Sequence, residues 1–221
     1  MTRFQSVGLI KRNMLISGLG ALMALTSGGA ANAEGASAPL QGRPAVTISN
    51  MNTFPNGPAV VGASVLTRYN TFVEATVSAA GLAASGAYSW WWVVFNYPEF
   101  CVGGCGLDDL PVGATPISNG DPRVRASLLW GGGFVANGTG AAEVRALLER
   151  NKAPGEVRFG PGLKRPRGAE LHIVLRSHGP AVAGEVADQI GRFDGGCTPE
   201  EIAMAMCPNA NVQFAAHSLA P

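Results

Sequence analysis

Residues 88–96 read Tyr-Ser-Trp-Trp-Trp-Val-Val-Phe-Asn and carry the clearest strand signal in the chain. Side chains alternate between the two faces of a β-strand, so both faces are apolar here: Trp90, Trp92 and Val94 point one way, and Trp91, Val93 and Phe95 point the other. This pattern predicts a central strand that is covered on both sides. The alternative use of the tryptophans is a platform on which sugar rings stack.

The composition around this strand indicates a β-rich chain. Only 14% of the residues are charged, while Gly numbers 30 and Pro 15. That balance is typical of short strands joined by many turns. We therefore expect a mostly β fold, an antiparallel β-sandwich or barrel-like single domain with one or two short helices and two disulfides.

Several other segments have strand character. Before the central strand they are residues 45–49, 65–73 and 74–80. After it, residues 123–136 and 140–148 flank Asn137-Gly138, a strong signal for a two-residue β-hairpin turn. The last strand expected is residues 211–217, in which Val212, Phe214 and Ala216 lie opposite Gln213, Ala215 and His217.

Residues 169–176 alternate between apolar and polar side chains. Ala169, Leu171, Ile173 and Leu175 share one face of this predicted strand. The other face carries Glu170, His172, Val174 and Arg176, and also His178 if the strand continues that far. A short helix is expected within residues 182–193, and a two-turn helix over residues 199–206, because Thr198-Pro199-Glu200-Glu201 has the form of a capping box.

The four cysteines are Cys101, Cys105, Cys197 and Cys207. An even number of cysteines in an exported chain predicts disulfides. Four cysteines allow three pairings, and we expect the local pairs Cys101–Cys105 and Cys197–Cys207 because each lies in its own Gly- or Pro-containing loop. A zinc site of all four is the alternative, although C-x3-C and C-x9-C do not match the spacing of zinc knuckles.

The first 33 residues have the features of an export signal. Arg3, Lys11 and Arg12 precede an apolar run from Met14 to Leu25, and small residues end at Ala31-Asn32-Ala33. The run is too short to span a bilayer, which needs about 20 residues. We predict a signal peptide over 1–33, a flexible leader over 34–44 and one β-rich domain over 45–221, placed in the periplasm or outside the cell.

Removing the signal leaves 13 Lys and Arg against 15 Asp and Glu, a net charge of −2. A nearly neutral chain has no overall electrostatic attraction to nucleic acid or to an anionic membrane. The expected partner is a protein or a small ligand, and the mature chain is expected to have no transmembrane segment.

Common catalytic motifs are missing from the sequence: it has no G-x-S-x-G elbow, H-E-x-x-H, P-loop, dinucleotide-binding G-x-G-x-x-G or EF-hand loop. The polar residues that remain gather on one strand. Glu170, His172, Arg176 and His178 are the predicted binding surface, with His172 held between Glu170 and Arg176 on a solvated sheet face.

The same histidines support a second interpretation. His172, His178 and His217 are all the histidines in the chain, and imidazoles that converge on one sheet face can bind copper or zinc. A third class, a hydrolase, needs a serine beside a histidine, and Ser177 and Ser218 are the neighbours in sequence.

Two further polar clusters each have a structural interpretation and a functional one. Asp108-Asp109 follows the first cysteine pair and either caps a turn, meets a basic loop or binds calcium. Residues 158–167 collect four basic side chains, which are either solvated or form a docking patch for an acidic partner.

The motifs W-W-V-V-F-N-x-P-x-x-C and G-G-C-G-x-D-D-L (residues 91–110), G-A-E-L-H-I-V-L-R-S-H-G-P (168–180) and N-V-Q-F-A-A-H (211–217) are similar to a family of uncharacterised exported bacterial proteins. The resemblance implies a bacterial origin and a single domain, with no activity to transfer. His178-Gly179-Pro180-Ala181 and Gly184 with His172 also resemble the H-x-H-G-P-A-x-x-G stretch of secreted CHRD β-sandwich domains, although the histidines here are six residues apart rather than two.

These patterns favour an exported, disulfide-stapled protein with a non-catalytic binding or structural role and no cofactor. The alternative is a periplasmic copper- or zinc-binding protein, or a metal-dependent redox protein, that uses the histidine cluster.

Overall fold

The computed structural model describes residues 42–55, 57, 59–204 and 206–219. The predicted signal peptide, residues 1–33, and residues 34–41 of the predicted leader lie outside the described residues. Within the described part the chain forms nine strands, which are β1 (Ala45–Thr53), β2 (Val60–Arg68), β3 (Phe72–Ala79), β4 (Gly86–Phe95), β5 (Ala126–Val135), β6 (Ala142–Glu149), β7 (Val157–Phe159), β8 (Glu170–Pro180) and β9 (Ala210–His217). Its helices are η1 (Pro98–Phe100), η2 (Pro122–Val124), α1 (Val186–Gly191) and α2 (Pro199–Ala203).

The strands form one curled antiparallel sheet in the order β6-β3-β2-β1-β9-β8-β4-β5-β7. Strand β4 hydrogen-bonds to β5 on one side and to β8 on the other, and all ten of its residues are buried. The three tryptophans are at most 1% exposed, so they pack the interior and offer no platform to a sugar. The prediction of a central strand covered on both faces is confirmed.

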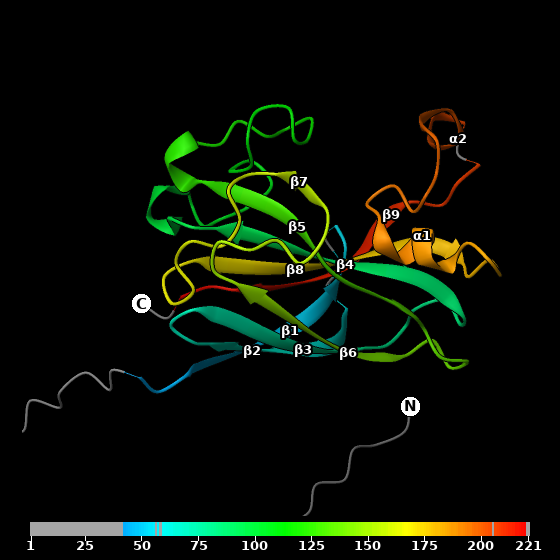
Figure 1. The fold of residues 1–221 in the computed structure, drawn as a ribbon, viewed down its shortest axis with the longest axis horizontal. Coiled ribbons are helices and arrows are strands. Elements are labelled where there is room, and N and C mark those ends of the chain that lie inside the picture. The colour runs from blue at the N-terminus through cyan, green and yellow to red at the C-terminus, as the bar shows by residue number, and fades with distance from the viewer. Residues whose placement is uncertain (1–41, 56, 58, 205, 220–221) are drawn as a thin grey trace, which may run out of the picture. The chain divides into compact units, whose positions relative to one another are not determined.

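The larger hydrophobic core lies inside the curl of the sheet. Trp90, Trp92 and Val94 from β4 meet side chains of β2, β3 and β6 there, including Leu66, Val77 and Leu148. Strands β6, β3 and β2 therefore face β4 and β8 across this core (Figure 1). Each fully buried aliphatic or aromatic side chain contributes about 1.5–3 kcal/mol of transfer free energy to this packing.

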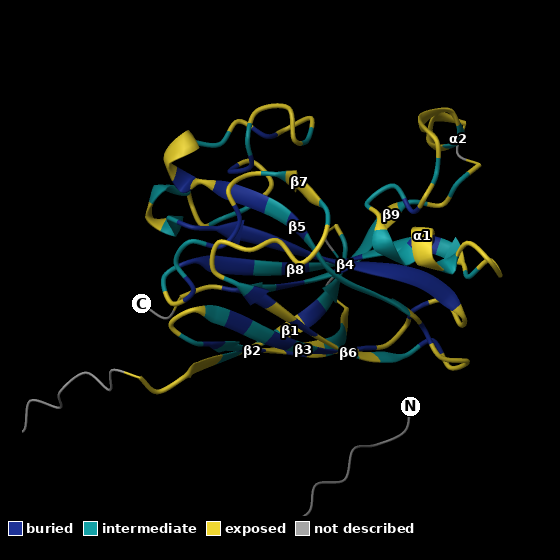
Figure 2. Ribbon diagram, in the orientation of Figure 1, coloured by how far each residue is buried: buried dark blue, intermediate teal, exposed yellow. Residues whose placement is uncertain are grey.

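A second, smaller core covers the other face of β4. Val93 and Phe95 pack there against Leu110 and Val124 from the long connection between β4 and β5. The disulfide Cys101–Cys105 closes a loop in this connection, and both cysteines pack against the second core. The Cys197–Cys207 disulfide closes the loop that contains α2. The predicted local pairing of cysteines is confirmed, and the covering segments are exposed on their outer side (Figure 2).

The sheet nearly separates where β1 meets β9, because these strands pair only at Asn52–Phe214 and Thr53–Gln213 among the described residues. Arg68, which is 1% exposed, lies at this seam. Its guanidinium donates to the carbonyl oxygens of Ala169 (2.6 Å), His217 (2.8 Å) and Pro166 (3.2 Å). Burial lowers the pKa of Arg68 to about 10, while the charge of Glu170 acts in the opposite direction, so the side chain is charged at neutral pH.

The predicted hairpin at Asn137-Gly138 is wrong. Strand β5 pairs with β4 and β7, whereas β6 pairs with β3, so the two strands do not form a ladder with each other. The Asn137 side chain instead accepts hydrogen bonds from the backbone of Thr139 and Ala141. This turn carries the chain from one half of the curled sheet to the other. Local turn chemistry does not reveal which strands the two flanking segments pair with.

Several element boundaries also differ from the sequence prediction: β1 continues to Thr53, β2 begins at Val60, and β7 was not predicted. The turn between β2 and β3 lies at residues 69–71 rather than at 73–74, where Tyr69 stacks on Phe72 at 4.2 Å between ring centroids. The capping box of Thr198 and Glu201 is present, but α2 ends at Ala203 rather than at Met206. The sequence prediction extended the second strand and the last helix too far, because apolar residues continue beyond the turn at 69–71 and beyond Ala203.

We expect Arg68→Met to lower the free energy of unfolding by about 3 kcal/mol, because three buried carbonyl groups lose their donor. Urea denaturation of the mature chain measures the change. Arg145→Met is the control, since Arg145 forms an exposed ion pair with Glu74 and such pairs contribute at most about 1 kcal/mol. Equal effects of the two substitutions would contradict a special role for Arg68 at the seam.

Candidate functional site

The predicted binding surface lies on one side of β8, as the alternation of its residues requires. Glu170, His172, Arg176 and His178 share this side, because β8 extends to Pro180, and Leu171, Ile173 and Leu175 face the main core on the other. The side is not an open, solvated face, however. Glu170 is 9% exposed and His178 is 3% exposed, since connecting segments of the chain cover this side of the sheet.

His172 was expected to contact both Glu170 and Arg176, but it contacts only Glu170 of the two. His172 Nε2 lies 2.7 Å from Glu170 Oε1, and its ring meets Phe95 edge-on. Arg176 instead donates to the carbonyl oxygens of Phe193 and Asn209 and to Asn211 Oδ1, and its guanidinium stacks over the Phe193 ring. The four side chains on this strand face therefore make separate contacts: Glu170 pairs with His172, while Arg176 and His178 have partners elsewhere.

His178 forms a buried hydrogen-bonded pair with Ser89 of β4, with 2.7 Å between His178 Nε2 and Ser89 Oγ. The Trp91 indole N–H also donates to Ser89 Oγ, so the serine hydroxyl joins β4 to both side chains. Desolvation, aided by the charge of Arg176, lowers the pKa of His178 to about 4. Ser89 is fully buried, so this Ser–His pair is closed to a substrate.

His217 lies on the opposite side of the sheet. It is paired with Leu171 of β8, and directly opposed residues of neighbouring strands point to the same face. Its Nε2 contacts Ser64 Oγ at 2.9 Å and its Nδ1 contacts Thr47 Oγ1 at 3.0 Å. Burial, with the charge of Arg68, lowers the pKa of His217 to about 4.

The predicted metal-ligand set is therefore not assembled. His172 and His178 lie on one side of the sheet and His217 on the other, and both ring nitrogens of His217 face hydroxyl groups. Among the described residues, no group of three or more His, Cys, Asp and Glu side chains could hold a metal ion. The alternation of side chains, which the sequence shows, does not indicate which face of each strand is turned toward the core.

The hydrolase interpretation also named the wrong serines. Ser64 and Ser89 contact the histidines, whereas Ser177 does not. Both lie far away in sequence, on strands that come beside the histidines only through folding. Both are fully buried, which makes these contacts structural.

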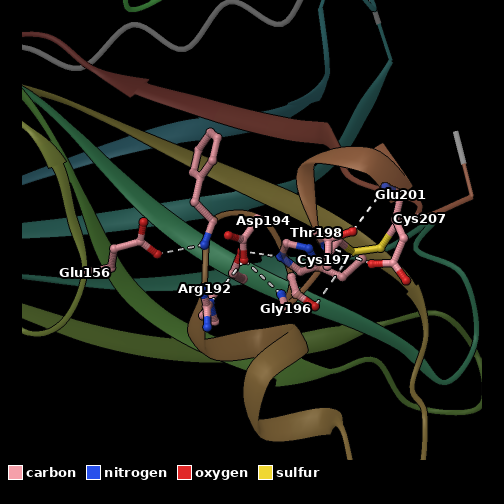
Figure 3. A network of polar contacts seen from close by, with 12 residues as sticks. Glu156, Arg192, Asp194, Gly196, Cys197, Thr198, Glu201 and Cys207 are labelled. Atoms are coloured by element: carbon pink, nitrogen blue, oxygen red, sulfur yellow. Dashed lines mark hydrogen bonds and ion pairs between the residues drawn. A yellow bond between two sulfur atoms is a disulfide. The ribbon is translucent and has the colours of Figure 1, made fainter. Parts of the chain in front are cut away.

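A folded segment, whose described residues are 192–204 and 206–209, covers the His178 end of this side. Asp194 accepts hydrogen bonds from Arg192 and from the Gly196 backbone, and Glu156 accepts from the backbone N–H of Phe193 (Figure 3). Gly195 lies directly against His178, where a Cβ would come within 2.4 Å of Nδ1, and its φ of +68° also favours glycine. The segment thus buries His178 by close backbone contact.

A hollow lies beside the second core, away from the histidines. It has a volume of about 450 Å³ and lies between residues 109–122 and residues 160–161, with Ala126 of β5 between them. Its lining is mostly apolar and includes Pro111, Val112, Pro122 and Pro161. We call it the loop cavity. A smaller hollow of about 330 Å³ lies on the other side of Pro111 and Val112 and reaches Phe193.

Asn96, which follows β4 directly, connects the two walls of the loop cavity. Its buried amide donates to the Arg125 carbonyl at 2.9 Å and to the Gly162 carbonyl at 2.8 Å. Its Oδ1 accepts from the Lys164 backbone at 2.7 Å, so every main hydrogen-bonding direction of the side chain is used. The sequence offered a hint of this role only as a polar residue at the end of an otherwise apolar strand.

The wall at residues 160–162 also rests on β5 itself. Ser127 Oγ accepts from the Gly162 backbone at 3.0 Å. Gly160, at φ +85°, packs so closely that a Cβ would come within 2.1 Å of the Ala126 carbonyl oxygen. These contacts fix this wall of the cavity against β5.

The acidic pair and the basic loop have structural roles here. Asp109 accepts from the backbone N–H groups of Val102 and Gly106 and so caps the first disulfide loop. The basic side chains of residues 158–167 are dispersed over separate partners, which are Glu156 for Arg158, Asn151 for Lys164, Glu99 for Arg165 and Asn70 for Arg167. They form no common patch for an acidic partner.

No protein-family model matches the chain, and no curated protein matches it significantly. None of the described helices has the length and apolar character that crossing a bilayer requires.

The buried histidines should make stability depend on pH. The unfolded chain takes up protons near pH 6.5, whereas folded His178 and His217, with pKa values lowered to about 4, stay neutral. The free energy of unfolding should therefore fall as pH decreases from 6.5 to about 4, by on the order of 2 kcal/mol per histidine. Urea denaturation at pH 7.0, 6.0 and 5.0 measures this slope.

Carboxylates also titrate near the lower end of this range, so the test compares the wild type with His178→Gln, His217→Gln and the double variant. Each single substitution should reduce the slope between pH 6.5 and 5, and the double variant should reduce it most. A double variant with the wild-type slope would show that these histidines do not cause the pH dependence.

Proposed function

We propose that this protein is an exported, non-catalytic binding domain that holds a small, mostly apolar molecule in the loop cavity. The observation that carries the proposal is the cavity itself, about 450 Å³ in volume and lined chiefly by apolar groups. Small-molecule sites in proteins are concave, mostly apolar and of roughly 300–1,000 Å³. The loop cavity falls within this range.

The cavity is also prearranged for binding. Asn96 holds both walls, Ser127 fixes residues 160–162 to β5, and Leu110 and Val124 anchor the other wall in the second core. A site whose walls are already ordered loses less conformational entropy when a ligand binds. This rigidity supports binding as the use of the cavity.

The surroundings favour binding over catalysis. A nucleophile needs a base within hydrogen-bonding distance and a path to the substrate. The two Ser–His pairs that the structure describes are buried, and they lie outside the lining of the loop cavity. The carboxylates that line the cavity, Asp109 and Asp121, already accept hydrogen bonds from the chain.

Export is supported by the predicted signal over residues 1–33 and by the two disulfides, which persist in oxidising compartments. The resemblance to exported bacterial proteins and to CHRD domains agrees with this placement. It adds no activity to the proposal.

The export proposal predicts the form of the secreted chain. When the full-length gene is expressed in a bacterial host, intact-mass analysis of the periplasmic extract should show a protein that begins at Glu34 and has no free thiol. A chain that retains Met1 and stays in the cytoplasm would overturn the proposal of export.

The binding proposal predicts that the neutral apolar fluorophore N-phenyl-1-naphthylamine binds the mature protein saturably at one site. Val112→Ser should weaken this binding about threefold to tenfold, because Val112 lines the cavity and its apolar contact is lost. Fluorescence titration measures both affinities.

Val102→Ser is the matched control, because Val102 is an exposed valine in the first disulfide loop and is not among the residues that line the cavity. It should leave the affinity unchanged. Absence of saturable binding, or equal effects of the two substitutions, would reject the loop cavity as the binding site.

A further inference from the structure

We propose that the ligand of the loop cavity is a small monocarboxylate with an apolar body, and that Arg125 binds its carboxylate group. This inference rests on the proposed function and specifies the chemistry of the same site. It follows from the charges around the cavity, from the fixed position of Arg125 and from the geometry of a guanidinium.

Three charged residues line the loop cavity: Asp109, Asp121 and Arg125. Both aspartates are engaged. Asp109 caps the first disulfide loop through both of its oxygens, and Asp121 accepts from the backbone and the guanidinium of Arg123. Within the described residues, the guanidinium of Arg125 has neither a hydrogen bond nor an ion pair.

The backbone of Arg125 is held firmly in place. The residue adopts the left-handed conformation, with φ 50° and ψ 51°, which is uncommon for a residue other than Gly, Asn or Asp. Its N–H donates to the Pro122 carbonyl, and its carbonyl accepts from the buried Asn96 amide. Such a conformation costs on the order of 1 kcal/mol and persists where surrounding contacts fix it, often at a binding site.

The guanidinium lies over the face of the Tyr97 ring, 6.0 Å from its centroid. A cation over an aromatic face keeps the N–H groups at its edge free for another partner. A guanidinium presents two parallel N–H donors that match the two oxygens of a carboxylate. The free edge of Arg125 at an apolar cavity therefore fits an anionic head group on an apolar body.

The charge balance also limits the ligand to one negative charge. Asp121 is paired with Arg123, but Asp109 lines the same cavity without an ion pair among the described side chains, so a second anionic group would meet its negative charge. A neutral ligand would form no charge-assisted hydrogen bond with the exposed Arg125 guanidinium. One carboxylate satisfies both conditions.

The test uses 4-phenylbutyrate and its neutral counterpart 4-phenylbutanamide as competitors for N-phenyl-1-naphthylamine on the mature protein at pH 7 and low salt. We expect the carboxylate to bind about threefold to tenfold more tightly than the amide, because the charged hydrogen bonds form at an exposed rim. Arg125→Gln should remove this preference, because the carboxylate loses its charged partner and the amide loses at most a neutral acceptor's contact.

Arg145→Gln is the matched control, because it removes the same charge from an exposed ion pair on β6 and should keep the preference. If the fluorophore binds but the wild type does not prefer the carboxylate, or Arg125→Gln retains the preference, the inference is wrong while the binding function stands. If the fluorophore itself does not bind, the proposed function fails and the inference fails with it.

Discussion

The burial of β4 on both faces is the constraint on which the rest of the structure depends. Trp90 and Trp92 on one face require a core, and the curled sheet provides it by bringing β2, β3 and β6 opposite β4. Val93 and Phe95 on the other face require a second cover, which the long connection between β4 and β5 provides through Leu110 and Val124. Because loops cover this face, the packing leaves hollows between them, and the loop cavity is one of these.

Buried polar side chains connect the strands where the apolar cores and the sheet hydrogen bonds do not. The sheet is weakly paired between β1 and β9, and the Arg68 guanidinium joins the backbone of β9 to residues 166–169 at that place. His217 adds contacts to hydroxyl groups on β1 and β2. These side chains are costly to bury, so their hydrogen bonds select one arrangement of the seam over looser alternatives.

The buried histidines are less suited to binding a ligand than the loop cavity is. His178 and His217 have lowered pKa values, but the cause is desolvation inside the fold, and their partners are serine and threonine hydroxyls. At the cavity, in contrast, the polar groups that build the walls are satisfied, and the guanidinium of Arg125 faces solvent without a partner in the described chain. A polar group that the fold does not use is the better candidate for binding a ligand.

Local sequence patterns determined the class of the fold, the burial of residues 88–96, the capping box at Thr198 and the pairing of the four cysteines, because each depends on residues close together in the chain. The alternation in residues 169–176 also placed Glu170, His172 and Arg176 on one side of β8 correctly. Only the tertiary structure decided that β6 leaves β5 to pair with β3, that His217 lies across the sheet from His172, and that Asn96 joins Arg125 to Gly162. These outcomes depend on which strands become neighbours, and that choice is made by long-range packing of the two cores rather than by any local pattern.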